Sequence, residues 1–253
     1  MHATHHETFA AYRHGIRDNL AQFLHQLVQV FLVGLTLGMM RTVVPALAES
    51  EFGVPKGSFL LLMAFVVAFG FVKGTLNFVA GRLSERLGRK TVLLLGWASA
   101  IPIPFMILYA PSWSWIVAAT VLLGMNQGFT WSMTQTAKLD ITRADQRGLT
   151  MGLNEFSGYV GVAVAGIITG YLATALGPRM GLFVFGATVI VTALVLTALW
   201  VKETLAWAHA EGARHAAGKS TGPTPRFPQN ISGQPTTWEV FTLMSWRDKR
   251  MAA

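Results

Sequence analysis

The chain has 253 residues, of which 52% are hydrophobic and only 13% are charged, and its formal net charge is +8. A soluble domain carries about 25% charged residues, so this composition argues against one large soluble core and favours a polytopic membrane protein. The chain contains no cysteine, which excludes disulfides and thiolate metal sites.

Residues 1–26 precede the first long apolar run. Between Phe9 and Leu27, apolar residues recur at helical spacing, with Arg13 and Arg17 among them. This pattern predicts an amphipathic segment at a membrane surface. No signal-peptide core follows a basic start, so we expect no cleaved targeting segment.

Residues 27–201 contain six apolar runs long enough to cross a bilayer, which takes roughly 17–25 residues per helix. The predicted spans are Leu27–Ala48, Ser58–Ala80, Thr91–Tyr109, Trp113–Thr136, Leu149–Leu176 and Met180–Val201. Their short connections favour an antiparallel bundle. The predicted fold is therefore an all-α, polytopic membrane domain with six transmembrane helices.

Prolines and glycines predict local features of these spans. Pro102 and Pro104 are expected to kink the third span. Glycine pairs at four-residue spacing favour close contact between helices. These pairs are Gly34/Gly38, Gly70/Gly74 and Gly166/Gly170.

The distribution of Lys and Arg predicts the orientation of the chain. Four cations lie in residues 81–90, Lys138, Arg143 and Arg147 fall in the next loop on the same side, and the tail adds more. On the other side only Lys56 and Arg179 occur. Because cytoplasmic loops carry the excess of Lys and Arg, both termini are expected in the cytoplasm, with the chain in a bacterial cytoplasmic (inner) membrane.

The segment Gly81-Arg82-Leu83-Ser84-Glu85-Arg86-Leu87-Gly88-Arg89-Lys90 carries the most specific motif. Gly81 and Gly88 are placed to make a tight turn. Glu85 is expected to form a local ion-pair network with the surrounding cations, Arg86, Arg89 and Lys90 among them. A solvated loop that only fixes topology is the alternative.

This segment resembles the loop between helices 2 and 3 of major facilitator superfamily transporters, with Glu85 where the family usually has Asp. The resemblance covers Gln26–Val201 and looks like the amino-terminal six-helix half. It implies that the charged loop switches between conformations. The family's fourth-helix Arg-x-x-Gln-Gly pattern is only partly kept, because Gly124 occupies the Arg position before Gln127-Gly128.

Three ionisable residues lie within the predicted spans: Arg41, Lys73 and Glu155. Charge inside a membrane is costly and marks functional sites. Lys73 and Glu155 lie at similar depth, so we expect them to pair across the bundle, with Glu155 as a protonation or cation site. Arg41 is placed to receive an anionic substrate group. The alternative is that the two cations reach out to the membrane interface and Glu155 sits in a wet cavity mouth.

Polar residues on the second, fourth and fifth spans either line a substrate path or hold helices together. The candidates for a substrate cavity are Asn77, Asn126, Gln127, Trp131 and Asn154. We find no phosphate-binding glycine loop, nucleophile motif or metal-spaced cluster. Enzyme activity, cofactors, a metal and a nucleic-acid partner are therefore not expected.

Residues 202–253 form the predicted cytoplasmic tail. A short polar helix near 204–217 is followed by a flexible linker over 218–235 and an interfacial segment over 237–250.

The predicted function is secondary active transport of a small solute by alternating access, as one half of a transporter of this family. The partners are then the lipid bilayer, the solute and a second six-helix half, from another chain or from a homodimer. The alternatives are a non-transporting membrane scaffold with the same half fold, or a truncated inactive transporter.

Overall fold

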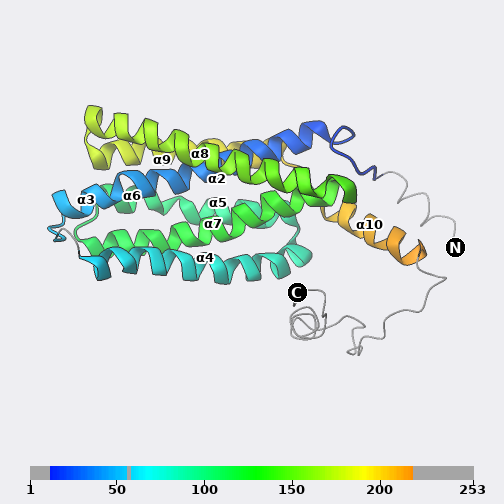
Figure 1. Cartoon of the computed structure of the whole chain (residues 1–253), viewed down its shortest axis with the longest axis horizontal. Coiled ribbons are helices and arrows are strands. Elements are labelled where there is room, and N and C mark those ends of the chain that lie inside the picture. The colour runs from blue at the N-terminus through cyan, green and yellow to red at the C-terminus, as the bar shows by residue number, and fades with distance from the viewer. Residues whose placement is uncertain (1–11, 56–57, 219–253) are drawn as a thin grey trace, which may run out of the picture. The chain divides into compact units, whose positions relative to one another are not determined.

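The computed structural model describes residues 12–55 and 58–218, and all regular structure in this part of the chain is helical. The chain falls into two units, 1–211 and 212–253; the first contains the bundle, and of the second only residues 212–218 are described. The elements (Figure 1) are α2 (Leu20–Thr42), α3 (Val44–Ser50), α4 (Phe59–Leu87), α5 (Arg89–Ala100), α6 (Pro102–Leu108), α7 (Trp113–Ile141), the 3-10 turn η1 (Ala144–Gln146), α8 (Arg147–Leu176), α9 (Pro178–Trp200) and α10 (Leu205–Gly218).

Five helical segments of the described chain are long and apolar enough to cross a bilayer. They are 20–50, 66–87, 89–108, 144–176 and 178–200. Helix α7 is more polar, but its 29 residues run between these segments and pack on α2, α4 and α5. The predicted all-α membrane bundle is confirmed, with α7 as the sixth and least apolar of its long elements.

Two predicted spans are interrupted. The third divides at Ile101, where α5 ends and α6 begins at Pro102, as the prolines predicted. The first divides at Val43, immediately before α3 with Pro45 in its first turn. Helix α2 starts at Leu20, before the predicted span, so residues 20–26 extend the first helix. The part of the predicted amphipathic segment before residue 12 lies outside the described residues.

Two glycines make single-residue turns between long helices. Gly88 separates α4 from α5 with φ +87°, and Gly177 separates α8 from α9 with φ +84°. Glycine adopts this left-handed region without the steric cost that a side chain adds. The turn predicted at Gly88 is confirmed. The turn predicted to begin at Gly81 is wrong, because α4 continues through Gly81 to Leu87.

Helices α2 and α8 approach each other closely along their glycines. A Cβ atom on Gly34 would lie 2.0 Å from the Gly158 carbonyl oxygen, and one on Gly161 would lie 2.3 Å from the Phe31 carbonyl oxygen. The close contact predicted for the Gly34/Gly38 pair is therefore confirmed. The Gly70/Gly74 pair lies on α4 with no atom within 4 Å of either Cβ position, so the contact predicted there is wrong.

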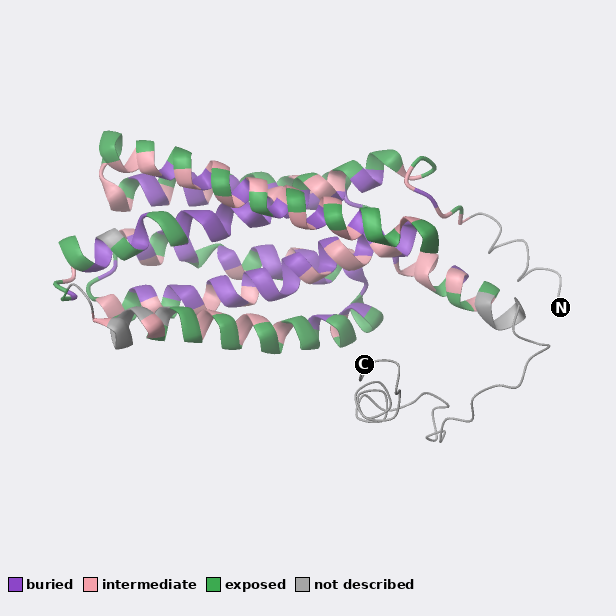
Figure 2. Cartoon of the chain, in the orientation of Figure 1, coloured by how far each residue is buried: buried purple, intermediate pink, exposed green. Residues whose placement is uncertain are grey.

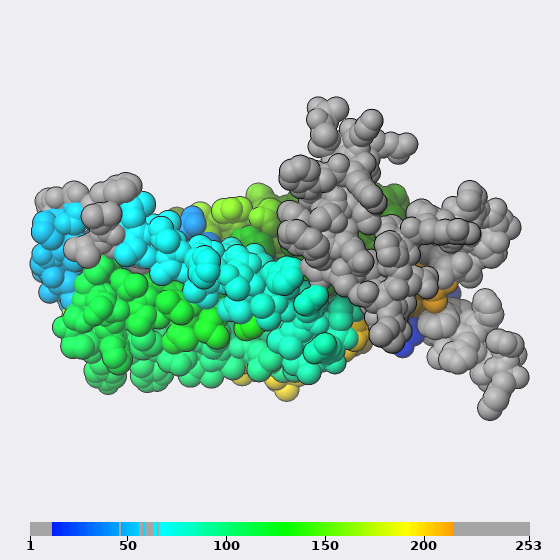
Figure 3. Space-filling model, turned by 90° about the horizontal axis from the view of Figure 1, so that it is seen from below, coloured from blue at the N-terminus to red at the C-terminus, as the bar shows by residue number. Residues whose placement is uncertain are grey.

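Glycines also bring α7 against α4. A Cβ on Gly128 would lie 2.8 Å from the Leu76 side chain, and one on Gly124 would lie 3.0 Å from the Val72 side chain. The space beside Gly124, where the family pattern has Arg, is therefore filled by the neighbouring helix in this chain. Figure 3 shows α4 (cyan) lying along α7 (green) on one face of the bundle.

Burial is concentrated on α2 and α7, whereas α4 and α8 are largely exposed (Figure 2). Phe71 on α4 and Tyr171 on α8 are 75% and 71% exposed. One end of the bundle holds the α4–α5 turn, the connection 142–146 and residues 201–204 that follow α9. We call it the charged end, because an ion pair and several side-chain caps join these segments there.

Candidate functional site

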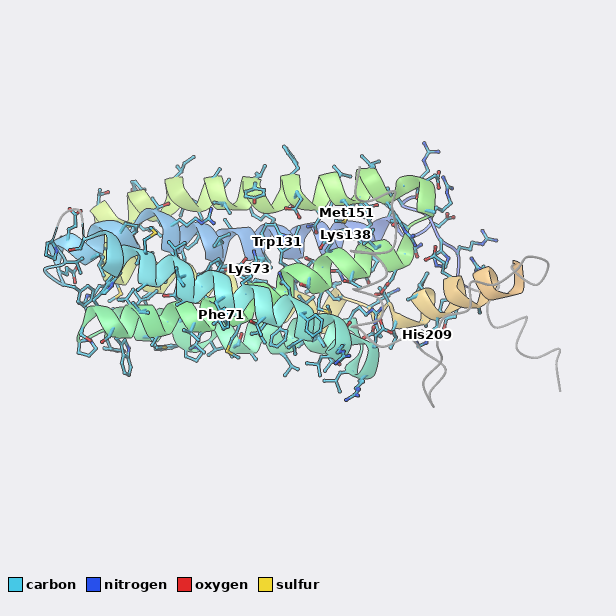
Figure 4. All side chains as sticks on the ribbon, turned by 60° about the horizontal axis from the view of Figure 1, so that its bottom comes forward. Phe71, Lys73, Trp131, Lys138, Met151 and His209 are labelled. Carbon is cyan, nitrogen blue, oxygen red and sulfur yellow. The ribbon has the colours of Figure 1, made fainter. Side chains whose placement is uncertain are left out.

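Lys73, Trp131 and Glu155 come together from three helices, α4, α7 and α8. The Lys73 ammonium lies 4.7 Å from the centroid of the Trp131 ring, a cation–π contact. The indole nitrogen of Trp131 donates a hydrogen bond to the Glu155 carboxylate at 3.0 Å. Figure 4 shows Lys73 and Trp131 on neighbouring helices in the middle part of the bundle. Trp131 thus connects a cation on one helix to an acid on another.

Neighbouring residues fix this group in place. Asn154 donates its side-chain amide to the same Glu155 oxygen at 3.0 Å. Gly158 makes room for the indole, since a Cβ there would lie 2.5 Å from the Trp131 ring. Tyr159 contacts Trp131 edge to face, with 6.0 Å between ring centroids. The carboxylate therefore has two hydrogen-bond donors and a fixed aromatic neighbour.

The sequence predicts that Lys73 and Glu155 pair across the bundle. Among the described residues, no ion pair joins the two side chains, because the indole of Trp131 lies between them. Lys73 also lies 5.8 Å from the Phe69 ring centroid. Lys73 and Glu155 still act on each other electrostatically, and Arg41 adds its charge to the environment of Lys73. Arg41 itself is exposed in the last turn of α2.

The remaining predicted cavity residues separate into two groups. Asn77 is exposed on α4 and accepts a hydrogen bond from Ser132 at 2.9 Å. Asn126 and Gln127 are fully buried. Asn126 donates to the Gly96 carbonyl at 2.9 Å, and Gln127 donates to the Val33 carbonyl at 2.9 Å. These two amides join helices inside the bundle, which was the alternative role considered for them.

At the charged end, Arg89 and Asp140 form a buried ion pair. The Arg89 Nε lies 2.9 Å from Asp140 Oδ2, and the two side chains are 5% and 8% exposed. Arg89 also bonds to Glu85 at 2.7 Å and donates to the Ser84 carbonyl at 3.0 Å. The ion pair between Glu85 and Arg89 was predicted from the sequence. Its buried partner Asp140 was not, because Asp140 was assigned to a loop.

The other residues of the charged motif lie around this pair. Arg86 and Glu85 are exposed on the last turns of α4. Lys90 donates its ammonium to the Ala198 carbonyl at 2.9 Å, which ties the start of α5 to α9. His209 on α10 reaches the second Glu85 oxygen at 4.0 Å.

Glu203 is a second residue whose role was not predicted from the sequence. Its carboxylate accepts hydrogen bonds from the backbone amides of Arg89 at 2.8 Å and Lys90 at 3.1 Å, which begin α5. It also accepts from the amide of Leu205 at 3.0 Å, where α10 begins. An acid at a helix N-terminus satisfies unpaired amides and the helix dipole. Gly88 makes this approach possible, because a Cβ there would lie 2.2 Å from Glu203 Oε2.

Lys138 is the third missed residue. The sequence predicts that Lys138 is a loop cation, yet it lies within α7 and is completely buried. Its ammonium donates to the Gln26 carbonyl at 3.1 Å. Lys138 and Asp140 both lie in the last turn of α7, which continues as a helix after its apolar stretch ends. This shared position is the sequence signal that could have identified them.

The connection after α7 carries an exposed pair for comparison. Arg143 Nε lies 3.1 Å from Asp145 Oδ1, and both side chains are more than half exposed. The hydrogen bond from Arg143 lowers the pKa of Asp145 below its usual value. Exposed pairs of this kind contribute little to stability because water screens them.

Comparisons with known proteins agree with this architecture. The chain is 29% identical over 144 residues to a proton-coupled antiporter flippase, LtaA, of Staphylococcus saprophyticus, covering 56% of this chain and 34% of that protein. It is 32% identical over 124 residues to the tetracycline resistance protein, class B, of Escherichia coli, covering 49% and 30%. The matched part spans about a third of each of these relatives. A sequence model described as Major Facilitator Superfamily matches residues 27–246, and the chain belongs to this family of membrane proteins.

Proposed function

We propose that the chain forms one half of a secondary transporter that moves a small solute across the membrane by alternating access. The observation that carries this proposal is the group of Lys73, Trp131 and Glu155, held between three helices in the membrane part of the bundle. Intramembrane charges of this kind are costly and mark solute or ion pathways. A scaffold that only binds a partner has no use for them.

The solute would contact the aromatic and charged groups on α4, α7 and α8. Lys73 supplies a positive charge, Glu155 a negative charge, and Trp131 and Tyr159 supply flat apolar surfaces. These groups suit a small amphipathic solute with a polar or charged part. One relative is an antiporter flippase and the other is a tetracycline resistance protein, so tetracycline is a suitable first probe.

A second six-helix half would complete the solute site. In this class of transporter, two repeats hold the substrate between them near the midplane. The large exposed apolar residues on α4 and α8, such as Phe71 and Tyr171, suit contact with that half or with lipid. The Arg89–Asp140 pair and its neighbours at the charged end would then hold one of the two conformations.

Solute binding and transport test this proposal. The chain in lipid nanodiscs would be screened by thermal unfolding against tetracycline and a panel of small amphipathic solutes, because a bound ligand raises the unfolding temperature. A solute that stabilises the protein would then be followed by counterflow in proteoliposomes. Glu155→Gln and Lys73→Met are expected to lose both effects, and Arg143→Ala at the exposed pair is expected to keep them.

Mass photometry of the same nanodiscs identifies the second half. A dimer, or a complex with another six-helix chain, supports the proposal. Counterflow that is unchanged in both Glu155→Gln and Lys73→Met would exclude the proposed site. Absence of binding and of counterflow for every solute, in a complex of established composition, would favour the scaffold.

A further inference from the structure

A column of buried polar groups runs between α2, α7 and α8, from the charged end to Glu155. Lys138, Gln26, Thr150 and Asn154 are each at most 1% exposed. Lys138 donates to the Gln26 carbonyl, and Asn154 donates to Glu155. These two bonds satisfy polar groups at the two ends of the column, but other polar groups between them have no hydrogen-bond partner.

Three side-chain oxygens in the column have no hydrogen-bond partner: Gln26 Oε1, Thr150 Oγ1 and Asn154 Oδ1. A buried ammonium carries three N–H donors, and Lys138 uses one of them on the Gln26 carbonyl. An unpaired buried polar group costs about 1–3 kcal/mol. Such a group in a folded protein usually has an ordered water or an ion as its partner.

The contacts between the helices place these groups at neighbouring levels. Gln135 on α7 reaches Met151 on α8 at 3.2 Å, so the next turn of α7, with Lys138, lies level with the first turn of α8, which carries Thr150. One turn in the other direction, Trp131 meets Glu155. Figure 4 shows Lys138 and Met151 close together, on the charged-end side of Trp131.

A cavity lies at the charged end, near this column. A cavity of about 170 Å³ is lined by residues from the start of α2, the end of α7 and the segment after α9, among them Asp18, Gln22, Ile141, Lys202 and Trp207. A cavity needs roughly 10–15 Å³ to hold one water, so this cavity has room for several water molecules.

This cavity lies one helical turn from the column on two helices. Gln22 precedes Gln26 by four residues on α2, and Ile141 follows Lys138 by three on α7. The amide nitrogen Gln22 Nε2 is itself buried without a partner.

We infer that ordered water fills this column and carries protons between Lys138 and Glu155, so that Lys138 is the proton exchange group for the acid in the solute site. In the step, the Lys138 ammonium gives a proton to a bridging water, and the water chain delivers a proton to the Glu155 carboxylate. The products are a neutral amine and a carboxylic acid, and the water is unchanged. Protonation of the amine from the cavity at the charged end completes the cycle.

Charged side chains stand at both ends of the relay. The Glu155 carboxylate accepts the indole hydrogen bond of Trp131, whose ring faces the Lys73 ammonium. A single acid therefore lies between a buried lysine on one side and a partly buried lysine on the other. The role of the relay in transport rests on the proposed function, in which the proton would be the coupling ion.

Time-resolved infrared spectroscopy on the full chain in nanodiscs, without solute, tests the relay. The carboxylic acid band of Glu155 is identified by its loss in Glu155→Gln, and its appearance is followed after a pH jump. Lys138→Met is expected to slow proton arrival at Glu155 at least tenfold. Thr150→Val, which removes an unpaired hydroxyl from the column, is expected to slow it severalfold.

The matched control is Thr169→Val on the same helix. Thr169 is 1% exposed like Thr150, but its hydroxyl is already bonded to the Ala165 carbonyl at 2.6 Å, so its removal is expected to leave the rate unchanged. If Lys138→Met does not fold, Lys138→Gln and Thr150→Val carry the test. Native rates in the Lys138 and Thr150 variants, or no Glu155 band at any pH where the bundle stays folded, would overturn the relay.

The result is separable from that of the transport experiment. If Lys138→Met shows counterflow and native rates of proton arrival, the relay is excluded and the proposed transport function is supported. If proton exchange is slowed in the Lys138 and Thr150 variants but the native protein moves no solute, the relay is supported and the proposed transport function is not.

Discussion

The indole of Trp131 donates to the Glu155 carboxylate at 3.0 Å, and its ring faces the Lys73 ammonium. A cation–π contact contributes about 0.5–2 kcal/mol, depending on how far the cation is removed from water. One side chain thus holds an acid and a cation near each other without letting them pair. Under the proposed function, both charges are available to the solute.

Replacing this indole separates its two contacts. Trp131→Phe keeps an aromatic face for Lys73 but removes the donor to Glu155, whereas Trp131→Leu removes both. We expect stepwise loss of solute binding, moderate in the first variant and larger in the second, measured by thermal shift in nanodiscs. Equal binding in all three proteins would show that Trp131 serves only packing.

Breaking the buried pair at the charged end is expected to destabilise the bundle strongly. Arg89→Ala leaves Asp140 buried without its partner, and loss of one member of a buried pair costs about 3–5 kcal/mol. Unfolding monitored by circular dichroism in mixed micelles measures the change. The control is Arg143→Ala at the exposed Asp145 pair, for which we expect little change because water screens the two charges. Similar losses in both variants would contradict a special role for the buried pair.

The two glycines of the charged motif should respond differently to alanine. Gly88→Ala forces a side chain into a left-handed conformation and against Glu203, so we expect a clear loss of stability. Gly81→Ala adds a Cβ to an exposed helical position with no atom within 4 Å, and we expect a gain of about 0.5–1 kcal/mol. Thermal unfolding of the two variants measures this difference. An equal change in unfolding temperature would argue against the turn described at Gly88.

The close contact between α2 and α8 can be tested in the same way, with one alanine variant at the contact and one away from it. Gly161→Ala would place a Cβ 2.3 Å from the Phe31 carbonyl oxygen, and overpacking of this kind costs about 1–3 kcal/mol. Gly70→Ala on α4 meets no atom within 4 Å and should be neutral or slightly stabilising. Unfolding temperatures in the same lipid would test this, and tolerance of Gly161→Ala would mean that the helices separate more easily than the structure indicates.

The absence of cysteine makes the orientation easy to measure. A single cysteine at Arg143, at the charged end, is expected to react with a membrane-impermeant maleimide only after cells are opened. A single cysteine at Ser112, at the opposite end, should react in intact cells. The reverse pattern would place the charged end outside and would contradict the cytoplasmic position predicted for both termini.

Much of the fold was predictable because it depends on local chemistry. Long apolar runs are sufficient to predict membrane helices, Pro102 has no amide hydrogen to continue α5, and Gly88 can adopt a conformation that other residues avoid. Gly81 did not end α4, because one glycine costs a helix only about 1 kcal/mol and nothing else in the sequence stops it there.

The site was less predictable because its residues acquire their roles from tertiary partners. Lys138 and Asp140 have loop-like composition in the sequence, and only the packing of α7 buries them. Asn126 and Gln127 were expected in a cavity, but their bonding partners on α5 and α2 are set by helix arrangement, which a single sequence does not contain. The placement of Trp131 between Lys73 and Glu155 depends on three helices at once.

Glu203 has a mechanical consequence for the charged end. Because one carboxylate binds the first amides of both α5 and α10, the start of α5 cannot shift without moving the segment that follows α9. The single-residue turn at Gly88 leaves no slack between α4 and α5 to absorb such a movement. A tilt of α4 is therefore transmitted through the start of α5 to the segment between α9 and α10.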